Sequence, residues 1–219
     1  MIMNELQKRI LTSLIIAPIF IILSYLGSYI FIFLLALLYI ISIIEINKIS
    51  NSKKKKLFNY ILITLFLIGL YFVRGKTDQE FIIFLWVSFV TFLSDIGGYL
   101  FGKLFKGKRL TTISPNKTYA GSLGSILLSL LSINVVNLLV TTFFSGNNFI
   151  NISLKNYLIV LFLSLTCQFG DLYFSYLKRL TLTKDTGNIL PGHGGILDRI
   201  DGMIFVFIAA LILKFSNLI

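Results

Sequence analysis

The chain has 219 residues, 56% of them hydrophobic, and a mean hydropathy of +0.89, which excludes an ordinary soluble domain. Its net charge is +11, and in a membrane protein a basic excess commonly sets topology and meets anionic lipid headgroups. Nucleic acid does not fit as the partner for this charge, because the sequence offers no soluble domain to bind it.

Long apolar runs follow one another along the chain, and runs of about 18 residues or more can cross a bilayer. Backbone polar groups inside lipid must be paired within each segment, so we expect an all-α, polytopic membrane protein with about seven transmembrane helices. The first run is followed by further runs, which argues against a cleaved signal peptide. The predicted spans are Ile10–Leu26, Tyr29–Ile46, Leu57–Val73, Phe81–Phe101, Tyr119–Phe144, Tyr157–Tyr176 and Met203–Ile219.

The basic residues are divided unevenly between the segments that join these spans. Arg74, Lys76, Lys155 and Lys214 fall on one side of the membrane, and all the others among the 20 Lys and Arg residues fall on the opposite side. The positive-inside rule then places the N-terminus and the two long polar loops in the cytoplasm.

The inner end of the sixth span carries a polar helix face. Asp171, Ser175 and Lys178 lie at i, i+4 and i+7, and Arg179 is adjacent. A Lys-Arg pair that snorkels at a helix end, with Asp171 as its partner, is the alternative interpretation. Ionisable groups at membrane depth are costly and usually functional, which favours a site.

Asp198 and Asp201 lie at i and i+3 where the last span begins. With Asp171 they form a candidate site for a hard cation such as Mg²⁺, which favours oxygen ligands and substrate phosphates. The alternative is that these acids cap the N-terminus of the helix.

A glycine turn, residues 191–195, precedes these acids and contains the only histidine, His193. Glycines let a backbone approach a ligand closely and present N–H groups to phosphate oxygens, although a plain turn is the alternative. Lys184 and Arg199 nearby favour phosphate binding.

A second polar group begins in the fourth span and continues into the loop after it. Asp95 shares a helix face with Gly98 and Gly102, for which helix packing is the alternative. The loop adds a hydroxyl and cation cluster, which could also be a solvated turn: Ser114, Lys117 and Thr118.

The polar residues from Ser175 to Asp201 form one continuous pattern. It reads Ser175-x-Leu177-Lys178-Arg179, then Lys184-Asp185-x-Gly187, then Leu190-Pro191-x-His193-Gly194-Gly195-x-x-Asp198-Arg199-x-Asp201. This pattern resembles the signature of the phosphatidate cytidylyltransferases (CDP-diacylglycerol synthases). Residues 95–102 and 114–121 resemble the family as well, so the resemblance covers about half the chain. Ala120 stands where family members often carry an acidic or amide residue, and the chain is shorter than is usual.

The resemblance implies that CTP and phosphatidate react to give CDP-diacylglycerol and pyrophosphate, with Mg²⁺ as cofactor and a second cation left open. It also implies a homodimer. Because the sequence shows no linker to a second domain, we expect a single membrane domain over residues 1–219, in a bacterial-type inner or plasma membrane. Within that domain we expect N-terminal spans in residues 1–80 and the catalytic part in residues 81–219.

The implied site has three sets of residues. The catalytic residues are Asp171, Lys178, Arg179, Lys184, Asp185, His193 and Arg199. The substrate-binding residues are Asp95, Ser114, Lys117, Thr118, Ser175, Gly194 and Gly195. The metal ligands are Asp171, Asp198 and Asp201.

Two alternative functions are open at this stage. A CTP-dependent kinase of polyprenols or other lipids is distantly similar, but the full pattern is not expected in one. A membrane transporter would carry charges near the bilayer midplane and inverted repeats, whereas the charges here cluster at one face.

Overall fold

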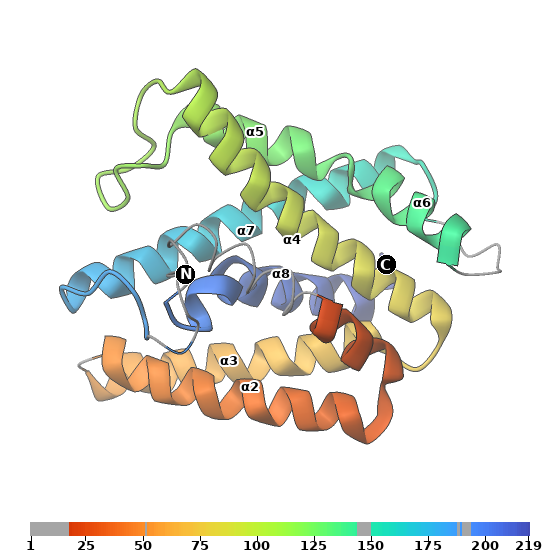
Figure 1. Ribbon diagram of the computed structural model, residues 1–219, viewed down its shortest axis with the longest axis horizontal. Coiled ribbons are helices and arrows are strands. Elements are labelled where there is room, and N and C mark those ends of the chain that lie inside the picture. Colours follow the sequence, from red (N-terminus) through yellow and green to blue (C-terminus); the bar gives the residue numbers. More distant parts are fainter. Residues whose placement is uncertain (1–17, 51, 144–149, 188, 190–193) are drawn as a thin grey trace, which may run out of the picture. The chain divides into compact units, whose positions relative to one another are not determined.

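The computed structural model describes residues 18–50, 52–143, 150–187, 189 and 194–219. Within these residues the structure is helical apart from loops and isolated bridge residues, among them the pair Arg109 and Thr118, which confirms the all-α prediction. Residues 18–26 are helical, and seven helices follow (Figure 1). They are α2 (Ser28–Ile49), α3 (Lys53–Arg74), α4 (Asp78–Phe105), α5 (Tyr119–Ser129), α6 (Ser132–Phe143), α7 (Leu154–Leu180) and α8 (Leu197–Phe215).

Five segments of the described chain are long and apolar enough to cross a membrane. They are Tyr29–Ile49, Lys53–Arg74, Asp78–Phe105, Tyr119–Phe143 and Leu154–Leu180. Each overlaps one predicted span, and the fourth comprises α5 and α6. The first predicted span lies partly outside the described residues. The last corresponds to α8, which carries two acids in its first two turns and Lys214 in its last. The polytopic architecture is therefore supported, and the count of seven is not confirmed.

The chain forms two compact units. The first contains Met1–Leu67 and Leu177–Ile200, and the second contains Ile68–Tyr176 and Asp201–Ile219. The predicted division at residue 80 is not tested by this clustering and stays a prediction.

In the first unit, α2 and the first part of α3 lie side by side (Figure 1). Polar contacts join their ends: Asn59 Nδ2 donates to Ser50 Oγ at 3.0 Å, and the Tyr60 hydroxyl donates to Asn47 Oδ1 at 2.7 Å. The loop of residues 181–196, here called the signature loop, joins α7 to α8 and belongs to this unit together with the ends of both helices.

In the second unit, α4 packs against α5, α6 and α7. The helix begins with a capping box, in which Thr77 Oγ1 accepts the Glu80 N–H and Glu80 accepts the Thr77 N–H. Buried polar side chains link the helices further along: Trp86 Nε1 donates to Ser132 Oγ of α6 at 3.2 Å, and Ser94 Oγ lies 3.1 Å from Ser164 Oγ of α7.

Glycines let α4 and α5 approach backbone to backbone. A Cβ at Gly97 would collide with the carbonyl oxygen of Gly124, and one at Gly124 would lie 2.7 Å from the carbonyl oxygen of Gly97. A Cβ at Gly98 would lie 2.8 Å from Ser125 Oγ. Of the two glycines predicted to pack, Gly98 therefore does so closely, and the tightest approach is at the neighbouring Gly97.

We expect Gly97→Ala to destabilise the protein by about 1–3 kcal/mol, because the added methyl meets backbone atoms that cannot rotate away. Gly102→Ala is the matched control in the same helix, since its nearest neighbour would be Thr118 Oγ1 at 3.4 Å. Thermal unfolding in detergent measures both. A Gly97→Ala midpoint equal to that of the control would contradict close packing at this crossing.

Candidate functional site

The predicted site residues fall into two groups, one in each unit. The first unit holds Lys178, Arg179, Lys184, Asp185, Gly194, Gly195, Asp198 and Arg199. The second unit holds Asp95, Ser114, Lys117, Thr118, Asp171, Ser175 and Asp201. His193 lies outside the described residues.

An ion pair organises the first group. Lys178 Nζ, at the end of α7, donates to Asp198 Oδ1 at 2.7 Å, and the two side chains are only 12% and 6% exposed. The other oxygen, Asp198 Oδ2, accepts the N–H of Thr186 at 2.8 Å and the N–H of Gly195 at 2.9 Å. Asp198 thus ties the end of α7 and both ends of the signature loop to the start of α8.

The pKa of Asp198 reflects these contacts. Burial raises the pKa of its carboxyl, but the hydrogen bonds from Lys178, Gly195 and Thr186 outweigh burial, so the pKa lies below its ordinary value. Asp198 is therefore ionised at neutral pH. Its role as a metal ligand stays a prediction, and its carboxylate already has protein donors on both oxygens.

Glycine is required at one position beside this carboxylate. Gly194 has a φ of +83°, which side chains rarely adopt, and a Cβ there would lie 2.8 Å from Asp198 Oδ2. The N–H of the next glycine, Gly195, points to Asp198. In this conformation the signature loop uses Gly195 to bind its own carboxylate, and phosphate binding by this N–H stays a prediction.

The cations and acids around the ion pair are more open to solvent. Lys184, Asp185 and Arg199 are exposed, and so is Arg179, which donates from Nη1 to the carbonyl oxygen of Thr183 at 3.3 Å. These charged groups are accessible from solvent, and ligand binding by them stays a prediction.

Glu45 of α2 contacts the signature loop, and the motif pattern does not reveal this contact. It is completely buried, at 0% exposure. Its Oε1 accepts the Ile196 N–H at 2.9 Å, and its Oε2 accepts the Leu197 N–H and the Thr186 hydroxyl, both at 2.8 Å. The available signal was an acid within a predicted span, where ionisable groups are costly.

The second group brings α4 and α7 together at two carboxylates. Asp95, Cys167 and Asp171 each offer one ligand atom within 4.8 Å of the others. The thiol of Cys167 donates to Asp95 Oδ1 at 3.6 Å. Two carboxylates suit a hard cation such as Mg²⁺, whereas a thiol does not, so the fit depends on Asp95 and Asp171.

Asp201 lies in the same unit at the start of α8, and its Oδ1 accepts its neighbouring Gly202 N–H at 3.0 Å. Glycines bring this part of α8 against α7: a Cβ at Gly170 would lie 2.7 Å from the Asp201 carbonyl oxygen, and one at Gly202 would lie 3.0 Å from Asp171 Oδ1. The backbone of α8 therefore runs directly beside Asp171.

Lys117 pairs with Asp171, at 3.3 Å between Nζ and Oδ2. Its Nζ is buried and makes no further polar contact within the described residues beyond this ion pair, so it keeps donors for an oxygen ligand. Its neighbours have structural partners: Thr118 Oγ1 caps α5 by accepting the Gly121 N–H at 3.1 Å, and the Ser114 carbonyl accepts the Lys117 N–H at 3.1 Å. Ser175 is partly exposed on α7, one turn after Asp171.

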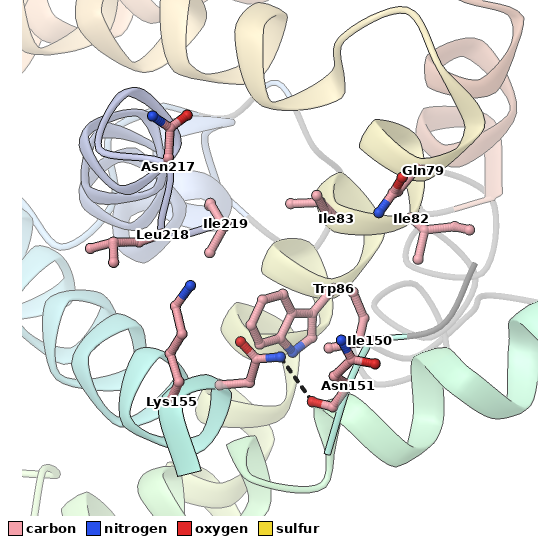
Figure 2. Close-up of a pocket in the computed structure, with 11 residues that line it drawn as sticks. Gln79, Ile82, Ile83, Trp86, Ile150, Asn151, Lys155, Asn217, Leu218 and Ile219 are labelled. Atoms are coloured by element: carbon pink, nitrogen blue, oxygen red, sulfur yellow. Dashed lines mark hydrogen bonds between the residues drawn. The ribbon is translucent and has the colours of Figure 1, made fainter. Parts of the chain in front are cut away.

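A cavity of about 320 Å³ lies elsewhere in the second unit (Figure 2). Trp86, Lys155 and the C-terminal residues 217–219 are among those that line it, and Asn156 Nδ2 donates to the Asn151 carbonyl oxygen at 2.8 Å on its wall. At about 1.5 Å per residue along α7, Lys155 is about 24 Å from Asp171. The cavity is therefore separate from the acidic group.

Comparison with known proteins identifies the family. A model of the cytidylyltransferase family matches residues 56–216. The chain is 41% identical over 121 residues to a phosphatidate cytidylyltransferase of Helicobacter pylori (strain J99 / ATCC 700824), covering 55% of this chain and 42% of that protein. It is 44% identical over 138 residues to the phosphatidate cytidylyltransferase of Staphylococcus haemolyticus (strain JCSC1435), covering 63% of this chain and 50% of that protein.

A phosphatidate cytidylyltransferase of Staphylococcus aureus (strain COL) is 41% identical over 140 residues, covering 64% of this chain and 51% of that protein. The chain thus spans about half the length of the curated relatives it matches. The family match covers most of the chain and includes every site residue discussed above except Glu45. The chain therefore belongs to the cytidylyltransferase family.

Proposed function

We propose that this chain transfers a cytidylyl group from CTP to phosphatidate, giving CDP-diacylglycerol and pyrophosphate. The observation that carries the proposal is the largely buried Lys178–Asp198 pair at the centre of the signature, beside exposed cations suited to phosphates. The family match and the names of three relatives support the same reaction. A lipid kinase or a transporter has no such support.

In this reaction a phosphate oxygen of phosphatidate attacks the α-phosphorus of CTP, and the bond from that phosphorus to the departing pyrophosphate breaks. A phosphate monoester loses its second proton near pH 6, so the nucleophile is already charged at neutral pH and needs no strong base. The difficulty is to bring two polyanions together, which depends on positioning and charge stabilisation.

The residues divide this task between them. We assign Lys178, Arg179, Lys184 and Arg199 to the phosphates of CTP and lipid, and Lys117 to one substrate phosphate. Asp185 and His193 orient the loop or the nucleotide, and Ser114, Thr118, Ser175 and Gly194 line the substrates.

Members of the family generally use divalent cations, and the acids of α4 and α7 fit one. We assign Asp171 and Asp95 to hold Mg²⁺, with Asp198 and Asp201 as further candidate ligands. When bound there, the cation supplies positive charge against the nucleotide phosphates.

The location and assembly are part of the proposal. The apolar helices support a membrane protein, and we place the site at the cytoplasmic face of the bacterial inner membrane, where CTP from the cytoplasm reaches a lipid in the leaflet. We also expect a homodimer.

Two labels on CTP test the reaction. Purified protein in detergent receives phosphatidate, Mg²⁺ and CTP labelled at either the α- or the γ-phosphorus. We expect the α-label to enter the lipid fraction, the γ-label to leave as pyrophosphate, and a chelator to stop both. The γ-label in lipid would indicate a kinase instead, and no lipid label from folded protein with several phosphatidates would contradict the proposal.

A further inference from the structure

Glu45 is a completely buried carboxylate that precedes the segment matched by the family model, which begins at residue 56. Burying an ionised carboxylate costs several kcal/mol unless it is paired or well hydrogen-bonded. Its three donors within the described residues lie between Thr186 and Leu197, so an N-terminal helix supplies a carboxylate to the signature loop from 141 or more residues away.

Glu45 caps α8 from outside that helix. The N–H groups at the start of a helix have no partner within the helix, and the helix dipole favours a negative charge there. Glu45 accepts two of them, one on each oxygen, from Ile196 and Leu197. This arrangement fixes the point at which the signature loop becomes α8, directly before Asp198.

Two glycines of the signature make room for this carboxylate. A Cβ at Gly187 would lie 2.9 Å from Glu45 Oε1, and a Cβ at Gly195 would lie 2.5 Å from Glu45 Oε2. Both distances are too short for a real Cβ. Glycine at these two positions therefore leaves the space that the Glu45 carboxylate occupies, in addition to any role in the loop itself.

Thr186 connects Glu45 to the ion pair. Its hydroxyl lies 2.8 Å from Glu45 Oε2 and 3.1 Å from Asp198 Oδ2, and with one proton it donates to the nearer oxygen, Glu45. Its N–H donates to Asp198. A continuous chain of hydrogen bonds thus runs from Glu45 through Thr186 and Asp198 to Lys178.

We propose that Glu45 is a positioning residue for cytidylyl transfer, holding the signature loop and the start of α8 so that Lys178 and Asp198 keep their places. This inference rests on the proposed function. Glu45 touches no substrate in this scheme and acts through Thr186 and the first N–H groups of α8.

Glu45→Gln tests the role with little change in shape. Because both Glu45 oxygens accept backbone N–H groups, either orientation of the amide turns its NH₂ group against one of these donors. We expect kcat to fall about 10- to 100-fold at saturating CTP and phosphatidate in protein that still elutes as folded. Glu80→Gln makes the same chemical change in α4, where Gln preserves a capping box, and should keep wild-type kinetics.

The bridge through Thr186 gives a second test. Thr186→Val removes the hydroxyl and should lower kcat, whereas Thr186→Ser keeps the hydroxyl and should restore it. If Glu45 acts through Thr186, the loss in Glu45→Gln/Thr186→Val is smaller than the product of the two single losses. Independent, multiplicative losses would overturn the proposed route. If Glu45→Gln were too unstable to purify, wild-type kcat in Thr186→Val would overturn the route by itself.

Hydrogen exchange separates this inference from the proposed function. In Glu45→Gln the amides of Ile196 and Leu197 should exchange about tenfold faster than in the wild type, and in Glu80→Gln they should not. If wild-type protein makes no CDP-diacylglycerol, the proposed function fails while this exchange still tests the anchoring of the loop. Faster exchange with wild-type kcat, or lost kcat with unchanged exchange, would overturn the positioning role.

Discussion

Asp171→Asn is expected to reduce turnover about 10²- to 10³-fold or more while the protein still inserts and folds. Asn has the same shape but carries no charge, so the change removes the partner of Lys117 and one of the two carboxylates shared by α4 and α7. Both the proposed cation and the proposed phosphate contact of Lys117 depend on that charge. The measurement is kcat for CDP-diacylglycerol formation, with Mg²⁺ titrated at each CTP concentration.

Asp78→Asn is the matched control for this change. Asp78 is exposed in the first turn of α4, so the same loss of charge there should leave kcat and the Mg²⁺ dependence unaltered. Equal unfolding midpoints for both variants would show that the lost turnover of Asp171→Asn is not lost folding. Wild-type turnover in Asp171→Asn would rule out the assignment of this carboxylate to a cation.

The helices were predictable because lipid leaves the backbone few choices. Long apolar runs must pair their N–H and C=O groups internally, and α2, α3, α4 and α7 follow the predicted runs with extensions of a few residues. The break between α5 and α6 was not predictable, because neither Gly nor Pro occurs at Leu130 or Leu131 to mark it. Ser129 instead uses its hydroxyl to bond the Ile126 carbonyl at this point.

The candidate site was predictable as a set of residues and less so as a set of contacts. The spacing placed Asp171 and Lys178 on one helix, but only the fold shows that Lys178 pairs with Asp198 and that Lys117 pairs with Asp171. Glu45 illustrates the limit most clearly. A single acid in an apolar run indicates a carboxylate whose burial costs free energy. The neighbouring sequence does not show which distant N–H groups offset that cost.

The glycines carry a similar lesson. The turn at residues 191–195 suggested N–H groups for phosphate, which stays a prediction. The structure adds a second role for the glycines of the loop, because Gly187, Gly194 and Gly195 leave room for the carboxylates of Glu45 and Asp198. A glycine in the sequence indicates only that a Cβ does not fit at that position. The neighbour that excludes the Cβ comes from the tertiary structure.

Lys178→Met is expected to lower both stability and turnover, because it leaves the Asp198 carboxylate, which is only 6% exposed, without its charged partner. Breaking one partner of a buried ion pair typically costs about 3–5 kcal/mol. Met keeps an unbranched apolar stem in place of the Lys stem, so the change acts mainly on charge. Thermal unfolding in detergent and kcat are measured together, and Lys155→Met, exposed at the other end of α7, is the control that should change neither.

A second substitution separates the structural part of this effect from the chemical part. In Lys178→Met/Asp198→Asn the stranded charge is gone, so the unfolding midpoint should recover much of what Lys178→Met lost. Turnover should not recover, because the proposed phosphate contact of Lys178 is still missing. If turnover returned together with stability, Lys178 would serve only to neutralise Asp198, and the phosphates would have to be held by the other cations of the signature.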